Sequence, residues 1–240
     1  MSFNYSPKIV TNGLILYLDA ANNRSYPGTG TTWIDLSKNG NNGTLINFGA
    51  QTIWNSSNGG SIVFDGSDDY VNMGDNDIFT QPGGFTFDIF YKPTTTNGNT
   101  ILEKYQATGN EYIFGFSGNG LYAWVSDNTL GGYNGRSVTS VSNYVTVNQW
   151  NHLVFVYDGG TVATSCKIYI NTVQRDNSNF KGGTFSSIRN TLTPLTIALY
   201  NNGLQAPIKG SVGSFKMYNR ALSLTEITQN FNATKTRFGL

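Results

Sequence analysis

The sequence is poor in cysteine, histidine and charge. Its 240 residues include one Cys, one His and only 12% charged residues, and the formal net charge is +1. A single cysteine, Cys166, forms no internal disulfide and belongs to no cysteine cluster that could hold zinc. Because no run of Lys or Arg is present, we expect neither nucleic acid nor an anionic membrane as a partner.

Long apolar runs are also missing. No stretch approaches the roughly 18 consecutive apolar residues that indicate a membrane-spanning helix. The N-terminus lacks the basic segment and apolar run of a secretory signal. We therefore expect a protein that is made in a cytoplasm and not exported by a cleaved signal peptide.

Glycine and aromatic residues are abundant instead. The chain has 28 Gly, 14 Tyr and 15 Phe, a composition typical of strands joined by many turns. Eight Asn-Gly pairs favour tight hairpins because they tolerate positive φ; they begin at Asn12, Asn39, Asn42, Asn58, Asn97, Asn119, Asn134 and Asn202. About a dozen strand-like runs have the spacing of an all-β sandwich: 13–20, 43–49, 61–66, 69–74, 84–93, 100–105, 111–117, 121–128, 150–159, 167–174, 194–201 and 208–219.

One helix is predicted near the C-terminus. In SLTEITQNFNA, Ser223 is a candidate N-cap and Glu226 stands three residues later, as in a capping box. Leu224, Ile227 and Phe231 share one apolar stripe. We expect this short helix to pack on an antiparallel sandwich that forms a single domain over residues 1–240, with Arg220 anchoring the C-terminal segment through a carboxylate or backbone carbonyls.

Alternation in the run 84–93 predicts the faces of one strand. The odd-numbered side chains from Phe85 to Tyr91 point one way, and the even-numbered side chains from Thr86 to Lys92 point the other. We expect the first set in the core and the second mostly in water, as in an antiparallel sheet packed on one side.

Four segments, in order, resemble the LamG-like group of concanavalin A-like lectin/glucanase domains. They are GLILYLDA with WIDLSKNGNNGTL, SIVFDGSDDYVNMG, WNHLVFVYDGG with KIYIN, and GSVGSFKMYNRALSLTEITQNFNA. The resemblance implies a jelly-roll sandwich with one concave face, often used for carbohydrate or protein ligands, and often a structural calcium. This chain departs from the pattern at Gly213-Ser214, where relatives often carry an acid.

The C-terminal segment NFNATKTRFGL adds a second likeness. It resembles the ends of domains found in bacteriophage virion proteins that lack signal peptides. That likeness implies a location on the virion surface.

The stretch FDGSDDYVNMGD at 64–75 holds four acidic residues, and several interpretations of it stay open. The first is a hairpin turn, in which Asp bonds to the backbone and Gly supplies positive φ. The second is calcium binding, since calcium takes carboxylate and amide oxygens. The order of the acids excludes an EF-hand loop, so a site needs two loops: Asp65 and Asp68 from this stretch, and Asp35, Asn39 and Asn42 from DLSKNGNNG.

The third interpretation is catalysis, which has less support in the sequence. Glucanases of this superfamily carry Glu-x-Asp-x-Glu on one strand, and none of the three Glu here, Glu103, Glu111 and Glu226, stands in such a pattern. Isolated Asp residues such as Asp68 and Asp69 would have to supply the carboxyl pair of a glycosidase. His152 lies in the strand-like run 150–159, which favours a packed or hydrogen-bonded histidine over a catalytic one.

Sugar recognition needs exposed aromatic side chains beside amide or charged groups. The candidates are Tyr105, Tyr122, Trp124 and Tyr133, together with Asn134 and Arg136 in the loop GGYNGR. Tyr122 and Trp124 stand two residues apart on a strand, so a core position is the favoured alternative for this pair. Residues 20–43 and 128–143 are expected to form long loops, where binding residues are common.

Three functions follow from these features. The leading hypothesis is a noncatalytic virion-surface domain, part of a decoration, fibre or tail, that binds glycans, such as a cell-surface polysaccharide, or neighbouring virion subunits. The second is an assembly protein without a sugar ligand, which packs against a capsid or copies of itself as a homo-oligomer. The third is a polysaccharide-degrading enzyme.

Overall fold

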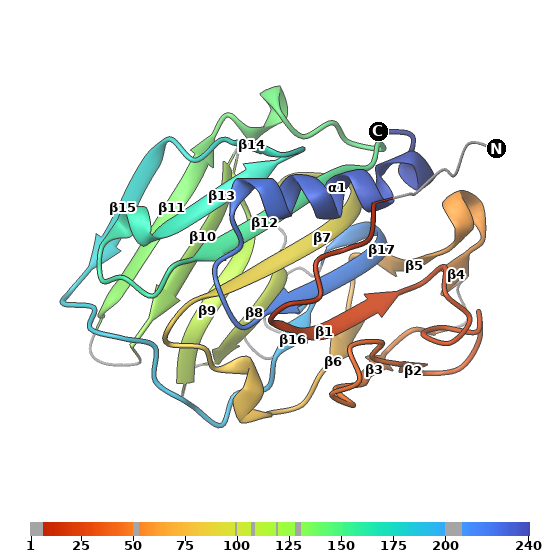
Figure 1. The fold of residues 1–240 in the computed structure, drawn as a ribbon, viewed down its shortest axis with the longest axis horizontal. Coiled ribbons are helices and arrows are strands. Elements are labelled where there is room, and N and C mark those ends of the chain that lie inside the picture. Colours follow the sequence, from red (N-terminus) through yellow and green to blue (C-terminus); the bar gives the residue numbers. More distant parts are fainter. Residues whose placement is uncertain are drawn as a thin grey trace.

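The computed structural model describes residues 7–49, 53–98, 100–106, 109–118, 120–127, 131–199 and 208–240. Two sheets pack face to face, and each pairing between described strands is antiparallel (Figure 1). The predicted antiparallel sandwich with one C-terminal helix is therefore confirmed. No helix within the described ranges has the length and apolar character needed to cross a membrane.

The eight-stranded sheet has the strand order β14-β13-β12-β7-β17-β5-β4, and β1 also pairs with β17. Its strands are β14 (Val173–Gln174), β13 (Cys166–Ile170), β12 (Asn151–Tyr157), β7 (Phe85–Pro93), β17 (Lys209–Tyr218), β5 (Ser61–Asp65), β4 (Trp54–Asn55) and β1 (Leu14–Asp19).

The nine-stranded sheet has the order β15-β11-β10-β9-β8-β16-β6-β3-β2. Its strands are β15 (Ser178–Gly182), β11 (Tyr133–Thr139), β10 (Gly120–Ser126), β9 (Gly109–Ser117), β8 (Thr100–Gln106), β16 (Thr196–Ile197), β6 (Tyr70–Asn72), β3 (Gly43–Ile46) and β2 (Thr32–Trp33). Short 3-10 turns connect some strands: η1 (Ser57–Gly59), η2 (Asp77–Phe79), η3 (Val141–Asn143) and η4 (Ala163–Ser165).

The hairpin predictions had mixed outcomes. The chain turns between β9 and β10 as predicted, with Ser117 opposite Gly120, although Asn119 itself lies outside the described residues, as does Asn202. The pair Asn134-Gly135, in contrast, lies inside β11. The expectation of one long loop at 128–143 is therefore wrong, because residues 133–139 form a strand between β10 and β15.

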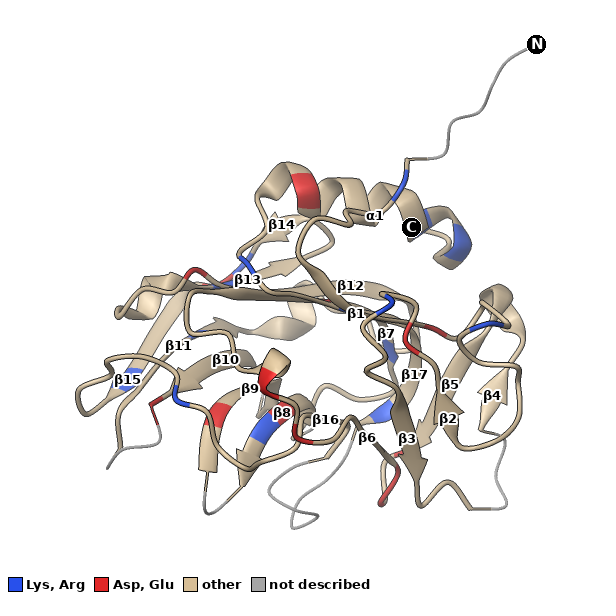
Figure 2. Ribbon diagram, turned by 60° about the horizontal axis from the view of Figure 1, so that its bottom comes forward, with Lys and Arg blue, Asp and Glu red and all other residues tan. Residues whose placement is uncertain are grey.

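Helix α1 (Leu224–Phe238) lies across the outer face of the eight-stranded sheet, so the layers run helix, eight-stranded sheet, nine-stranded sheet (Figure 2). Its N-terminus has the predicted capping box: the Ser223 side chain accepts from the Glu226 backbone N–H, and the Glu226 carboxylate accepts from the Ser223 N–H. Arg220 anchors this end as predicted, with 2.6 Å between its Nη2 and Glu226 Oε1.

The expectation that the outer side of β7 is mostly wet is wrong. Phe85, Phe87, Ile89 and Tyr91 fill the core as predicted, but Thr86, Asp88 and Phe90 on the other side are also fully buried. The helix explains this burial, since Phe90 stacks on the ring of Phe238 with 4.7 Å between centroids. Gly213 in β17 belongs to the same contact, because a Cβ there would strike the Phe238 ring. This packing accounts for glycine at a position where an acid was expected.

A buried polar network fixes the sheet to the helix. Lys216 Nζ lies 3.0 Å from Asp88 Oδ1, and both side chains are fully buried. Asn230 of α1 donates to Asp88 Oδ2 over 2.9 Å and accepts from the backbone N–H of Val10 over 2.8 Å. His152 Nε2 lies 3.2 Å from Asp88 Oδ2, so the histidine is packed in the fold, as predicted. Burial alone would raise the pKa of the Asp88 carboxyl, but the neighbouring Lys216 and His152 hold it below its ordinary value.

We expect Asp88→Ala to lower the free energy of unfolding by roughly 3–5 kcal/mol, because it leaves the Lys216 ammonium buried without its partner. The matched control is Lys167→Ala, which breaks an ion pair whose side chains are 34% and 37% exposed. That variant should cost less than about 1 kcal/mol. Urea denaturation of both variants measures the difference, and equal losses would contradict a structural role for the network.

Candidate functional site

The outer face of the nine-stranded sheet carries the predicted aromatic residues. Along β10, Leu121, Ala123 and Val125 are fully buried in the core, whereas Tyr122 and Trp124 are partly exposed on the opposite side. The favoured assignment of Tyr122 and Trp124 to the core is therefore wrong. The residues between them already fill the core positions, and alternation directs this pair outward.

The register of the sheet places a third aromatic side chain, Phe180, beside this pair. Trp124 lies opposite Gly135 of β11, and Gly135 lies opposite Phe180 of β15. Phe180 was not predicted as a binding residue. Its run SNFKG alternates between half-buried and exposed positions, but only its pairing with a strand about forty residues earlier in the chain brings Phe180 to this row.

Four rings form a continuous series across these strands. The centroid of Tyr105 lies 5.4 Å from that of Trp124, with the two ring planes nearly perpendicular. Trp124 lies 5.9 Å from Tyr133, and Tyr133 lies 6.0 Å from Phe180. Such spacings are those of directly packed aromatic rings. We call Tyr105, Tyr122, Trp124, Tyr133 and Phe180 the aromatic face.

Glycines beneath the rings let them lie across neighbouring strands. A Cβ added at Gly135 would stand 2.5 Å from Phe180 Cζ and 2.6 Å from Trp124 Cβ. A Cβ at Gly182 would likewise strike the ring of Tyr133. Phe180 and Tyr133 therefore each extend over a glycine of the adjacent strand, which leaves ring surface facing outward along the sheet.

Two hollows flank the aromatic face, of 670 Å³ and 320 Å³. Trp124 and Phe180 line both of them. Hydroxyl groups surround the larger hollow, contributed by Ser117, Tyr122, Ser137, Thr139 and Ser140. Among the described residues that line either hollow, none is charged.

The structure separates Asn134 and Arg136 from the aromatic side chains. Both alternate with Tyr133 along β11 and point to its other side. Asn134 is 4% exposed and donates to the Thr161 carbonyl over 2.6 Å. Arg136 Nε donates to Asp176 Oδ2 over 2.7 Å and holds the segment that follows β14. Grouping these two residues with Tyr133 was therefore wrong, because Tyr133 begins a strand.

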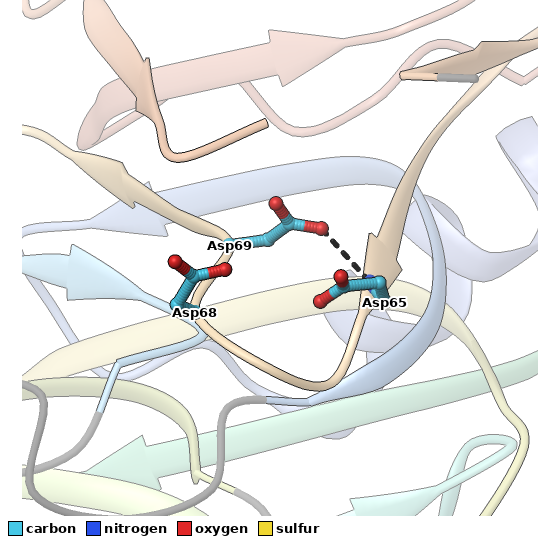
Figure 3. Close-up of side chains that lie close together, drawn as sticks. All are labelled: Asp65, Asp68 and Asp69. Carbon is cyan, nitrogen blue, oxygen red and sulfur yellow. Dashed lines mark hydrogen bonds between the residues drawn. The ribbon is translucent and has the colours of Figure 1, made fainter. Parts of the chain in front are cut away.

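The acidic stretch at 64–75 forms a corner between the two sheets. The predicted turn is confirmed, since Gly66 has a positive φ and Asp side chains bond to the backbone. Strand β5 belongs to the eight-stranded sheet and β6 to the nine-stranded sheet, however, so the two strands do not pair as a hairpin. The backbone N–H of Asp65 donates to Asp69 Oδ2 over 2.8 Å, and the N–H of Ser67 donates to Asp65 Oδ1 over 2.7 Å. The carboxylates of Asp65, Asp68 and Asp69 offer oxygen atoms that all lie within 4.8 Å of one another (Figure 3).

The Asp35 loop does not complete a calcium site with this corner. Asp35 is 7% exposed, and each of its carboxylate oxygens accepts hydrogen bonds within the fold, including one of 2.9 Å from Tyr17 N–H and one of 2.7 Å from the Ser37 hydroxyl. Asn42 Oδ1 accepts from the Asp35 N–H, and Asn39 Nδ2 donates to the Ile15 carbonyl. The carboxylates that gather at the corner do not include Asp35, so the predicted two-loop ligand set is wrong for Asp35. Asn39 and Asn42 as ligands stay a prediction.

Calcium at the corner stays a prediction for Asp65 and Asp68, with Asp69 as the third carboxylate. Three carboxylates are ligands of the type that calcium prefers. We expect calcium at 100 times its Kd to raise the free energy of unfolding by about 2.7 kcal/mol. Asp68→Asn should abolish the increase, while Asp158→Asn, at an exposed ion pair elsewhere, should keep it. Thermal unfolding with and without calcium measures both, and no shift for the unmodified chain would contradict the prediction.

Comparison with known proteins identifies the fold. The family model of the concanavalin A-like lectin/glucanases superfamily matches residues 65–228. No sequence among the curated proteins matches the chain.

Solved structures show the same architecture. Domain 4 of AbnA, a GH43 extracellular arabinanase from Geobacillus stearothermophilus, in complex with arabinotriose, is 20% identical over 90% of this chain and 97% of that domain, with a TM-score of 0.61. The binding domain of Paraclostridial Mosquitocidal Protein 1 is 18% identical over 93% of this chain and 52% of its own, with a TM-score of 0.68. Botulinum neurotoxin type C, which interacts with two ganglioside molecules, is 15% identical over 94% and 52%, with a TM-score of 0.63. The chain spans about half the length of the two toxin chains, and identities this low show a shared fold.

Proposed function

Because this chain belongs to the concanavalin A-like lectin/glucanases superfamily, we propose that it is a noncatalytic carbohydrate-binding domain whose ligand lies on the aromatic face. The observation that carries the proposal is the continuous series of rings from Tyr105 to Phe180 over two hollows. Ring surfaces of this kind pack against the apolar faces of sugars, and the surrounding hydroxyl groups provide hydrogen-bond partners.

The placement of carboxylates supports binding without hydrolysis. Most glycoside hydrolases need two carboxyl groups about 5–9.5 Å apart across the scissile bond. No described residue lining the two hollows is an Asp or a Glu. Glu103 lies next to the aromatic row, opposite Ile113, but it is 2% exposed. Asp69 is fully buried at the corner, and its Oδ2 is bonded to the Asp65 N–H.

Solved neighbours support a sugar ligand by analogy. The arabinanase domain is in complex with arabinotriose, and the neurotoxin interacts with gangliosides. An exposed apolar patch on the outer face of the eight-stranded sheet would instead favour an assembly protein without a sugar ligand. Helix α1 covers that face at Phe90, which favours the carbohydrate-binding function.

Display on a virion surface, with the neighbouring virion subunits as further partners, belongs to the same proposal. It rests on the likeness of the C-terminal segment to domains of bacteriophage virion proteins. In the fold, residues 230–238 of that segment belong to α1, where Phe231 and Phe238 pack on Phe90. Immunogold electron microscopy of assembled particles tests this part: labelled particles are the expected result, and unlabelled particles would exclude the virion location while leaving sugar binding untouched.

Trp124→Ala and Tyr133→Ala should each weaken glycan binding by about tenfold or more, because each removes a ring from the centre of the series. The matched control is Phe231→Ala, which removes a partly buried ring from α1 on the opposite side of the sandwich and should bind as the unmodified chain does. Binding is measured on a glycan array and then by calorimetry with a glycan that the array identifies. A chain that retains no glycan from a broad array would refute the proposed function.

A further inference from the structure

The two hollows of the aromatic face have no charged side chain among their described lining residues, and Trp124 and Phe180 line both of them. We infer that the aromatic face binds an uncharged glycan segment of at least two sugar rings, which lies across Trp124 and Phe180 and occupies both hollows. This inference rests on the proposed function and names the class of its ligand.

The uncharged lining of the two hollows favours an uncharged ligand. Carboxylate and sulfate groups of acidic glycans are held most strongly by Arg and Lys, through charge-assisted hydrogen bonds. The described lining residues offer aromatic rings, amides and hydroxyl groups, but no cation. An acidic sugar would lose its hydration there without a compensating charge, and that loss is costly. A neutral sugar loses less and gains the same ring contacts.

The cations of the adjacent strands point elsewhere. Arg136 of β11 is engaged by Asp176, with 2.7 Å between the guanidinium and the carboxylate. Lys181 of β15 alternates with Phe180 and lines a third hollow of 580 Å³ together with Asn134 and Asn179. Phe180 also lines that hollow, but Asn134 and Asn179 alternate with the aromatic face along β11 and β15, so the hollow extends from the edge of the sheet toward its other side. Neither cation lines the two hollows of the aromatic face.

The position of the shared rings favours a ligand of at least two sugar rings. Trp124 and Phe180 line both hollows, so a ligand that covers these rings extends into both. Gly135 allows both side chains to lie close to its backbone, since any Cβ at this position would stand 2.5 Å from Phe180 and 2.6 Å from Trp124. A single sugar uses part of this surface, whereas two or more linked sugars contact the rings on both sides of Gly135.

Affinity measured against chain length and charge tests the inference. We expect a neutral disaccharide or trisaccharide to bind about tenfold more tightly than its monosaccharide, since stacking on further rings adds on the order of one factor of ten. Binding should change little between low and high NaCl, because screening acts on charged groups. A second comparison uses polygalacturonate and its fully methyl-esterified form, which share a backbone and differ in charge; any retention should be of the esterified polymer.

Two glycine variants test the role of the shared rings. Gly135→Ala should reduce the advantage of the oligosaccharide over the monosaccharide to less than about twofold, because the added methyl group separates Phe180 from Trp124. The control is Gly83→Ala, where an added Cβ meets nothing within 4 Å. Neither glycine has a positive φ, so φ strain does not distinguish the two variants. A Cβ at Gly135 would also stand 2.7 Å from the Ala123 carbonyl oxygen, so the fold of this variant is checked first. If Gly135→Ala does not fold by circular dichroism, Phe180→Ala on the last strand of the sheet replaces it, with the same expected result.

The outcomes distinguish the inference from the function on which it rests. Preferred binding of sialylated, sulfated or uronate-containing glycans, or affinity that falls steeply with salt, would overturn the uncharged ligand and leave carbohydrate binding in place. Equal affinity for monosaccharide and oligosaccharide would overturn the shared-ring site in the same way. Absence of binding to any glycan would refute the proposed function itself.

Discussion

The two-residue alternation of the β-strands is the constraint on which the rest of this structure depends. Once Leu121, Ala123 and Val125 face the core, Tyr122 and Trp124 have only the outer face of the nine-stranded sheet available. The same rule on β7 sends Phe90 and Asp88 to the outer face of the eight-stranded sheet. Each sheet thus has apolar side chains on the side away from the core. One set is covered by helix α1, and the other is partly exposed.

Helix α1 covers one of these outer faces, while the other remains partly exposed. On the eight-stranded sheet, Asp88 and Lys216 neutralise each other, and Asn230 of the helix bonds to the same carboxylate. Burying these charges is favourable only where each has its partners, so the network specifies where the helix lies. On the nine-stranded sheet, the rings of the aromatic face contact one another and no described helix covers them. An exposed apolar patch of this kind is typical of a binding surface.

Local patterns in the sequence predicted what depends on neighbouring residues. The capping box at Ser223, the core side of β7 and the class of the fold all follow from spacing over a few positions, and they were confirmed. Four of the predicted aromatic residues also lie on one surface, although Tyr122 and Trp124 had been favoured as core residues. The sequence could not show that a helix covers β7, because that contact joins residues about 140 positions apart.

The wrong predictions about the site have the same physical origin. Asn134-Gly135 has the sequence of a turn, yet it lies within β11, so the side of the sheet to which Asn134 and Arg136 point was assigned wrongly. Asp35 and Asp65 were grouped because both are acidic loop residues, but the Asp35 carboxylate accepts hydrogen bonds from Tyr17 of β1 and from Ser37 of its own loop. Phe180 was missed because its place in the aromatic row is set by its pairing with Gly135. Each of these depends on which strands are neighbours, and alternation alone does not contain that information.

Two glycines in the strands make room for the rings of the aromatic face. Gly135 and Gly182 lie beneath Phe180 and Tyr133, and in each case a side chain on the glycine would displace the ring. A strand interior that contains glycine is weakened, since glycine has no side chain to pack and more backbone entropy to lose. Here the ring of the neighbouring strand occupies the vacant position and recovers part of that packing. The abundance of glycine and of aromatic residues, which first indicated only strands and turns, therefore also provides the surface on which a flat ligand can lie.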